Sequence, residues 1–197
     1  PGYIGSGNPA YLMSENGDAL RVFSSIWDGN VSPTPVFNVE EDAASTVNEV
    51  EQDRGDHRFT VLRESADGTY LEQVAQLPST ARPTHIGKPG ESLYAARFAG
   101  DRAYAVTFEL KDPLYVIDLS SQEDPQIRGE LELPGFSTLL EPVGEGLLLG
   151  VGYDVADDDS GLTQGLKITL FDVANIDAPI VLQSAVIGKR GSFSPIL

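Results

Sequence analysis

Four aspartates in the last third of the sequence form its densest group of potential metal ligands. They are Asp154, Asp157, Asp158 and Asp159. Asp157 and Asp159 alternate and are followed by Ser160 and Gly161, which matches part of a calcium loop, where alternating oxygen ligands precede a glycine turn. A complete loop also has a bidentate glutamate several residues later, and the sequence offers none before Lys167. We therefore keep two interpretations, a calcium site and a solvated acidic hairpin loop.

No residue is predicted to be catalytic. The two histidines, His57 and His85, are far apart in the sequence, and no Ser-His-Asp order or GxSxG nucleophile turn accompanies them. The glycine pairs that begin at Gly144 and Gly150 lie in a predicted strand with no helix after it. They therefore do not indicate a nucleotide-binding loop.

The charge and composition of the chain exclude several classes of partner and site. Its 197 residues carry a formal net charge of −17, and because nucleic acids and anionic membranes bind basic surfaces, neither is predicted as a partner. No apolar stretch approaches the roughly 18 residues of a membrane helix, so no membrane insertion is predicted. The chain has no cysteine, which excludes disulfides and thiolate metal sites.

Short apolar alternations bounded by Gly, Pro, Asp and Asn run through the sequence and predict an all-β fold. The predicted strands are Ala19–Ser24, His57–Arg63, Tyr70–Gln76, Ser92–Phe98, Ala103–Phe108, Leu114–Leu119, Gln126–Leu133, Leu147–Gly152, Lys167–Val173 and Ile180–Ile187. Two further strands are expected in Pro9–Ser14 and Phe136–Val143.

A strand-turn-strand unit repeats in the second half of the chain. Leu114–Leu133 matches Ile168–Ile187 without a gap at a shift of 54 residues, so that Asp118 meets Asp172 and Pro125 meets Pro179. A carboxylate at the end of a strand accepts backbone N–H groups from the next turn, so we interpret both aspartates as structural. The preceding strands correspond as well.

A looser copy comes first, in Gly17–Ser25 and His57–Pro78, with Arg63 at the position of Asp118. Four-strand units at this spacing predict β-propeller blades, whereas a β-sandwich of about ten strands would not require such a repeat. We expect a single partial propeller over residues 1–197: a degenerate first blade in 1–80, a second in 90–135, a third in 136–188 and the start of a further blade in 189–197. Three blades cannot close a ring, so open edges favour self-association.

Two acidic segments interrupt the predicted blades. Residues 28–56 contain eight acids and one arginine, and residues 154–165 contain the four aspartates. Both segments lie between the second and third strands of a blade, and equivalent loops of a propeller share one face. The sequence therefore predicts an acidic rim as the contact surface.

Arg97 lies in a strand that lines the central channel if it is the innermost one. An inward arginine binds an anionic ligand, or it pairs with an acidic residue of the neighbouring blade. Both interpretations stay open at this point.

The stretch ESLYAARFAGDRAYAVTFELKDPLYVIDLSSQEDPQIRGELELPGFS, from Glu91 to Ser137, resembles the bacterial and archaeal secreted β-propeller domain family, which is distantly related to WD40 repeats. GDRAYAVTF, DPLYVIDL and GELELPGFS carry the resemblance, and the IDL and DP units are also similar to the short LVIVD repeat. The resemblance implies a propeller and a secreted, periplasmic or cell-surface protein, and it supplies no catalytic residue. Members tend to carry a tyrosine and a histidine in the region where this chain has Glu141.

These observations predict a non-catalytic binding or interaction scaffold of an exported protein, with a protein or carbohydrate partner and no cofactor other than calcium. The alternative is an exported hydrolase or lyase with its site in the channel of the complete propeller.

Overall fold

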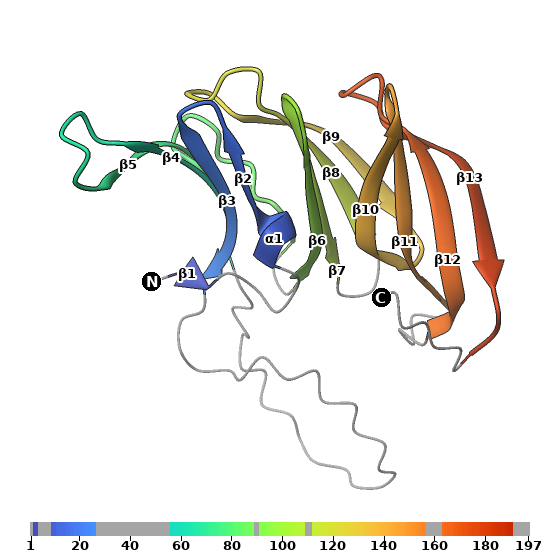
Figure 1. The fold of residues 1–197 in the computed structure, drawn as a ribbon. Coiled ribbons are helices and arrows are strands. Elements are labelled where there is room, and N and C mark those ends of the chain that lie inside the picture. The colour runs from blue at the N-terminus through green and yellow to red at the C-terminus, as the bar shows by residue number, and fades with distance from the viewer. Residues whose placement is uncertain are drawn as a thin grey trace, which may run out of the picture.

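Three antiparallel sheets stand side by side in the structure (Figure 1). The computed structural model describes residues 2–3, 9–26, 56–88, 91–108, 112–156 and 163–190. These residues form one short helix, and all other regular elements are strands. The predicted all-β class with four-stranded, propeller-type blades is confirmed.

The first sheet contains β2 (Met13–Asn16), β3 (Ala19–Ile26), β4 (Asp56–Glu64) and β5 (Leu71–Leu77), and the two-residue strand β1 (Gly2–Tyr3) also pairs with β3. The strand expected in Pro9–Ser14 starts only at Met13, because Pro9–Leu12 form the helix α1. Proline is favoured in the first turn of a helix. The turn places Leu12, which is 5% exposed, in the core.

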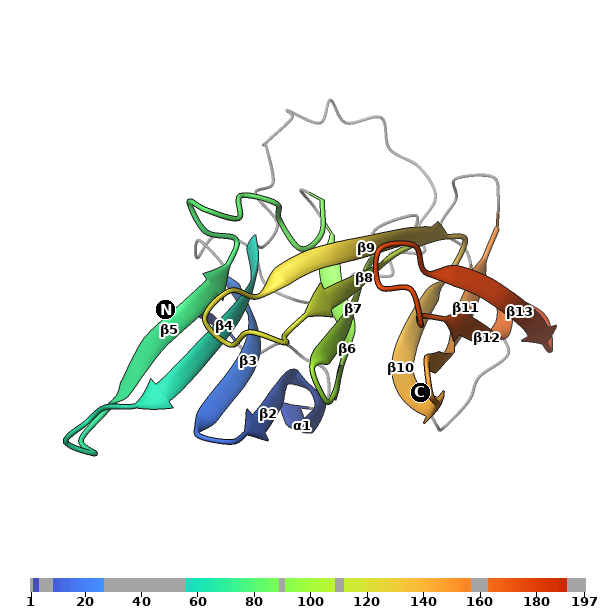
Figure 2. The same cartoon turned by 90° about the horizontal axis from the view of Figure 1, so that it is seen from above.

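The second sheet has the order β6 (Ser92–Ala99), β7 (Arg102–Phe108), β8 (Asp112–Asp118) and β9 (Gln126–Leu133). The third has the order β10 (Phe136–Gly144), β11 (Leu147–Val155), β12 (Thr163–Asp172) and β13 (Ile180–Ile187). Seen from above, the first strands β2, β6 and β10 gather in the lower middle of the view, and the last strands β5, β9 and β13 lie at its left, upper and right margins (Figure 2). We call these the innermost and outermost strands.

The repeat is visible in the strand register. Asp118 pairs with Gln126 in the second sheet, and Asp172 pairs with Ile180 in the third, which is the shift of 54 residues. A register shift falls at the same place in each outermost strand and leaves one residue bulged. The bulged residues are Val74, Arg128 and Leu182.

The second strands of the two blades, β7 and β11, correspond at a different shift from the one that an alignment of Gly100 with Gly144 indicates. Arg102 pairs with Asp118, and Leu147 pairs with Asp172, so these two residues correspond at a shift of 45. The turns before Arg102 and Leu147 both have two residues, so Gly100 and Gly146 stand at different positions within turns of equal length. A slip of one residue would exchange the two faces of the strand, so the strand register, and not the position of the glycines, identifies the equivalent residues.

Two apolar cores fill the spaces between consecutive sheets. The core between the first and second sheets includes Phe23, Phe59, Val61, Ala103, Ala105, Tyr115 and Ile117. The core between the second and third includes Tyr104, Val106, Leu114, Val116, Leu140, Leu148, Phe171 and Val173. Alternate residues of the middle sheet thus belong to different cores. Each large side chain buried in this way contributes about 1.5–3 kcal/mol to the stability.

The close approach of the second and third sheets depends on Gly129 in β9. A Cβ atom at this position would overlap the carbonyl oxygen of Ile176 and lie 2.8 Å from Cδ of Pro179, both in the turn between β12 and β13. The glycine is required here for space, because a backbone oxygen cannot move aside as the end of a flexible side chain can.

We expect Gly129→Ala to lower the free energy of unfolding by about 1–3 kcal/mol, since overpacking forces neighbouring atoms apart. Urea denaturation followed by circular dichroism measures the change. Gly144→Ala is the matched control, because a Cβ there meets only Leu147 at 3.5 Å or more. Equal losses in the two variants would contradict the steric role of Gly129.

Candidate functional site

Four aromatic rings from two blades gather at one end of the stack. Tyr94 and Phe136 lie near the starts of β6 and β10, and Phe108 and Tyr153 lie near the ends of β7 and β11. The centroid of Phe136 is 5.0 Å from that of Tyr94, 4.5 Å from Phe108 and 5.7 Å from Tyr153. We call these four residues the aromatic cluster. The sequence analysis missed it, because only the strand pairing shows that these strand ends meet.

The aromatic cluster is partly exposed. Tyr94 is 38% exposed, and the other three rings are half-buried. The narrow space between the sheets beside Phe136, which Lys167 and Thr169 also line, has a volume of about 10 Å³, room for no more than one water molecule. A ligand would therefore lie on the cluster and not between the blades.

The acidic segments of the sequence leave the sheets at this same end. Ile26 ends β3 and Asp56 starts β4, while Val155 ends β11 and Thr163 starts β12, all at the lower end of Figure 1. Residues 27–55 and 157–162 lie outside the described residues, which includes the predicted ligands Asp157, Asp158 and Asp159.

Asp154, the remaining predicted calcium ligand, has a cationic partner. Its Oδ1 lies 3.0 Å from Nζ of Lys167 on the neighbouring strand β12. Lys167 also donates a hydrogen bond of 2.6 Å to the carbonyl oxygen of Pro134. A calcium ion at Asp154 would compete with this ammonium group. In the described ranges, no three His, Cys, Asp or Glu side chains are grouped as metal ligands.

Arg97 forms an ion pair with the neighbouring blade, which is one of the two interpretations that the sequence left open. Its guanidinium lies 2.9 Å from Oε2 of Glu141 on the innermost strand of the third sheet. Its Cζ atom also lies 5.2 Å from the ring centroid of Tyr11 in α1, a cation–π distance. Arg97 thus connects the second sheet to the third sheet and to helix α1. Its Nε atom is buried without a hydrogen-bond partner.

Asp118 and Asp172 have the structural role that the repeat predicted. Asp118 accepts a 2.9 Å hydrogen bond from the N–H of Ser120, and Asp172 accepts an equal one from Ala174. The Ser120 N–H is the main cause that lowers the pKa of Asp118 below its usual value, with a smaller contribution from the charge of Arg128. Both aspartates therefore stabilise the turns that follow their strands.

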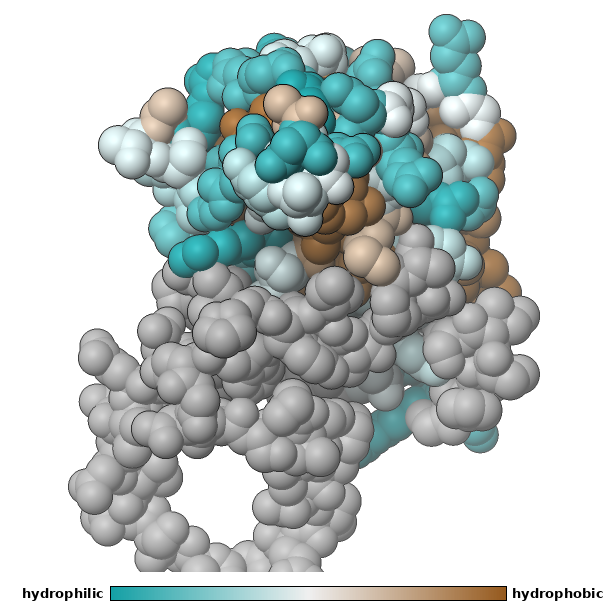
Figure 3. All heavy atoms as spheres, turned by 60° about the vertical axis from the view of Figure 1, so that its left-hand side comes forward, coloured by the Kyte–Doolittle hydropathy of each residue, from teal (hydrophilic) through white to brown (hydrophobic). Residues whose placement is uncertain are grey.

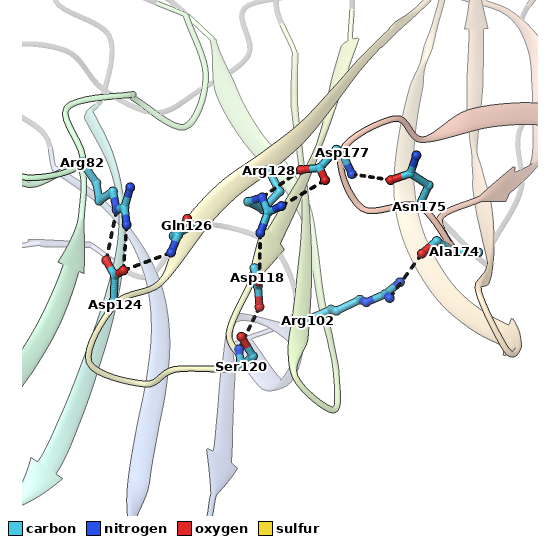
Figure 4. A network of polar contacts seen from close by, with 10 residues as sticks. All are labelled: Arg82, Arg102, Asp118, Ser120, Asp124, Gln126, Arg128, Ala174, Asn175 and Asp177. Carbon is cyan, nitrogen blue, oxygen red and sulfur yellow. Dashed lines mark hydrogen bonds and ion pairs between the residues drawn. The ribbon is translucent and has the colours of Figure 1, made fainter.

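Ion pairs connect the outermost parts of neighbouring blades (Figure 4). Arg128 reaches from β9 to Asp177 of the third sheet with a distance of 2.8 Å and lies 3.3 Å from Asp118. Arg82, before the second sheet, pairs with Asp124 at 2.7 Å. Arg63, which replaces the repeated aspartate in the degenerate blade, pairs instead with Glu123 of the second blade at 3.0 Å.

A buried serine–histidine pair lies between the first and second sheets. Ser25 and His57 are cross-strand neighbours, and the Ser25 hydroxyl lies 2.8 Å from Nδ1 of His57. His57 Nε2 lies 2.9 Å from the carbonyl oxygen of Glu91. A carbonyl oxygen only accepts, so Nε2 of His57 carries a proton and donates this hydrogen bond.

This arrangement resembles a nucleophile and base, but Ser25 and His57 are only 7% and 3% exposed. The Glu91 carboxylate is equally buried and accepts a 2.5 Å hydrogen bond from Thr107. We interpret the group as a polar connection between blades. The sequence alone does not indicate this pair, because recognising it requires the register of β3 and β4, which places Ser25 opposite His57.

The pKa of Asp118 leads to a pH prediction. Because folding lowers this pKa from its usual 3.8, the stabilising contribution is present above that value and is lost as the pH falls through the folded value. We expect Asp118→Ala to cost about 1 kcal/mol at pH 7 and less at pH values well below 3.8. Urea denaturation at several pH values checks this. Asp118→Asn keeps the oxygen acceptor and should cost less, and a cost independent of pH would contradict the assignment.

A double-mutant cycle tests the role of Arg97. We expect Arg97→Ala and Glu141→Ala to be coupled by about 0.5 kcal/mol, the usual size for a partly exposed ion pair. The free energies of unfolding of the two single variants and the double variant give the coupling. Zero coupling would mean that the pair does not stabilise the blades, and it would favour the ligand-binding interpretation of Arg97.

No helix in the described part of the chain has the length and apolar character needed to cross a membrane.

Comparison with known proteins agrees with this architecture. An uncharacterized protein of Methanocaldococcus jannaschii is 47% identical over 90 residues, which are 46% of this chain and 13% of that protein. An uncharacterized protein of Archaeoglobus fulgidus is 42% identical over 89 residues, 45% of this chain and again 13% of the relative. The chain thus matches only a small part of the length of either relative. The family model described as "Beta propeller domain" matches residues 1–197, and the chain therefore belongs to the β-propeller domain family.

Proposed function

We propose that this chain is part of a non-catalytic binding scaffold of an exported protein, and that the end of the stack with the aromatic cluster is its contact surface. The observation that carries the proposal is the meeting of four aromatic rings from two blades at the end where both acidic segments leave the sheets. Aromatic side chains are favoured contacts at binding surfaces, because they offer a large apolar area at small entropic cost.

The negative charge at this end of the stack indicates which chemical groups a partner would present. Residues 28–56 and 154–165 together contain twelve acids, eight and four; Asp56 starts β4 and Asp154 lies in β11, and the other ten belong to the segments between second and third strands. A surface with so much negative charge attracts cationic groups and repels anionic ones. A protein partner with a basic surface fits this charge, and a carbohydrate partner would fit the rings, with calcium as a bridge to the carboxylates.

The polar groups within the stack support a scaffold. The ion pairs of Arg97, Arg128 and Arg63 each connect different blades, and Arg82 connects the segment between β5 and β6 to the second blade. They hold the strand ends in a fixed arrangement, as a rigid binding surface requires. Export is proposed from the family resemblance alone, and fractionation of cells of the source organism with an antibody against the chain tests it.

The alternative of a hydrolase or lyase stays a prediction, because a site in the channel of a complete propeller would need blades beyond the three described. Turnover of a panel of glycosides and esters by the purified protein would overturn the non-catalytic proposal.

Substitution of an exposed ring of the aromatic cluster tests the contact surface. The ligand is a lysine-rich peptide, or a glycan that binds the parent protein on a glycan array. We expect Tyr94→Ala to weaken this binding about tenfold, which corresponds to about 1.4 kcal/mol. Tyr70→Ala is the matched control, because Tyr70 is 58% exposed in the turn between β4 and β5 at the opposite end. Isothermal titration calorimetry measures both affinities.

Equal affinities of the two variants, or no binding of any probe by the parent protein, would contradict the proposed surface. The same titrations in millimolar calcium and in chelator test the bridging ion. A melting temperature unchanged between these conditions would contradict a calcium site that involves Asp154 and residues 157–159.

A further inference from the structure

The outermost strand of the third sheet, β13, is an edge strand with no charged side chain. It follows β12 in the sheet order, so only one of its two edges is paired with a described strand. The outermost strand of the second sheet, β9, carries Arg128, Glu130 and Glu132. The outermost strand of the first sheet, β5, carries Glu72, and the side of the molecule that Figure 3 brings forward is mostly hydrophilic over this sheet. Charges on an edge strand oppose its pairing with another chain, and β13, with the sequence IVLQSAVI, lacks them.

The apolar side chains of β13 are exposed on both faces of the strand. Its large apolar residues, each 38% to 54% exposed, are Ile180, Val181, Leu182, Val186 and Ile187. Val181 pairs with Phe171 and Val186 with Lys167, which lie on the face of β12 that is turned toward the second sheet. The second sheet nevertheless leaves Val181 and Val186 exposed. Their exposure therefore does not depend on what covers the opposite face of the third sheet.

The sequence of β13 reads nearly the same in both directions once its bulged residue, Leu182, is left out. The remaining residues are IVQSAVI, with Ser184 at the centre. Two copies of this strand can pair antiparallel about a two-fold axis at Ser184. The opposite residues are then Ile180 with Ile187, Val181 with Val186, Gln183 with Ala185, and Ser184 with itself. In each of these pairs both residues belong to the same face of the strand, as an antiparallel pair requires.

The same arrangement is unfavourable for β9. Glu130 is the equivalent of Ser184, because it pairs with Tyr115 as Ser184 pairs with Thr169, at the repeat shift of 54 residues. Two copies of β9 that paired about this position would place the Glu130 carboxylates of both copies opposite each other. Like charges directly opposite one another destabilise a strand pair. The self-complementary pattern is thus a property of β13 and not of the repeat.

The charges on either side of β13 complement one another. Two copies of a chain with a net charge of −17 repel each other, so a contact between them requires a segment without excess negative charge. Asp177 precedes β13, and Lys189 and Arg190 follow it. Antiparallel pairing brings the basic end of one copy toward the acidic end of the other, and it does so twice because the axis is two-fold.

We infer that β13 is the pairing edge of a homodimer, in which the outermost strands of two copies align antiparallel about a two-fold axis at Ser184. The two third sheets then form one continuous sheet. This contact uses the free edge of a blade and not an uncovered blade face, so it is available whether or not the propeller ring is closed. The ends of the strands that carry the aromatic cluster point in opposite directions in the two copies.

A charge on the pairing edge tests the inference. Val186→Glu gives β13 the charge that Glu132 gives to β9 at the equivalent position. We expect it to raise the dissociation constant of the dimer about tenfold or more, because Val186 lies opposite Val181 of the second copy. Val143→Glu on the innermost strand β10 is the matched control, since Val143 is 48% and Val186 49% exposed. It should leave the dissociation constant unchanged.

Sedimentation velocity over a range of protein concentrations measures association, and circular dichroism checks that both variants fold. A parent chain that stays monomeric at high micromolar concentration would overturn the inference. A dimer that persists in Val186→Glu would also overturn it, because the copies would then meet through another surface.

A disulfide at the two-fold axis tests the register. The chain has no native cysteine, and opposite residues of an antiparallel pair have Cα atoms about 4.5–5.5 Å apart, which a disulfide can span. We expect Ser184→Cys to form a covalent dimer with oxidised glutathione as the oxidant. Glu130→Cys is the matched control, an exposed thiol at the equivalent position of β9, and it should form at least tenfold less. Equal yields of covalent dimer from the two variants would contradict the proposed register.

Discussion

Apolar packing between consecutive sheets is the interaction on which the rest of this structure depends. Each strand of the middle sheet places alternate side chains in two different cores. Exposure of either face of this sheet to water would therefore cost free energy. The same bulge in each outermost strand keeps equivalent residues on equivalent faces. A shift of one residue would place the residues of one core in the other.

The charged residues take the positions that this packing leaves to them. Arg128 and Arg63 connect blades at their edges, Arg82 connects the segment between β5 and β6 to the second blade, and Arg97 connects blades near the innermost strands. Asp118 and Asp172 stabilise the turns at the strand ends. The packing between sheets restricts the choice of residues least at the strand ends. The acidic segments and the partly exposed rings occur there, which is why the proposed contact surface lies at that end.

Much of the fold could be predicted because it repeats. The gapless match between Leu114–Leu133 and Ile168–Ile187 indicated both the blades and the structural role of the two aspartates. The second strands were harder to align, because glycines at Gly100 and Gly144 suggest a shift one residue shorter than the true one. Helix α1 was missed because its four residues are too few to show a helical period.

The sequence by itself determined the all-β class, the blade repeat and the acidic character. Those properties depend on residues close together in the chain or on a fixed spacing. Only the tertiary structure decided which residues meet: Arg97 with Glu141, Ser25 with His57, and Tyr94 and Phe108 with Phe136 and Tyr153. These contacts join separate strands, and in most cases separate blades, so they depend on the register and the packing of whole sheets, which no local pattern encodes.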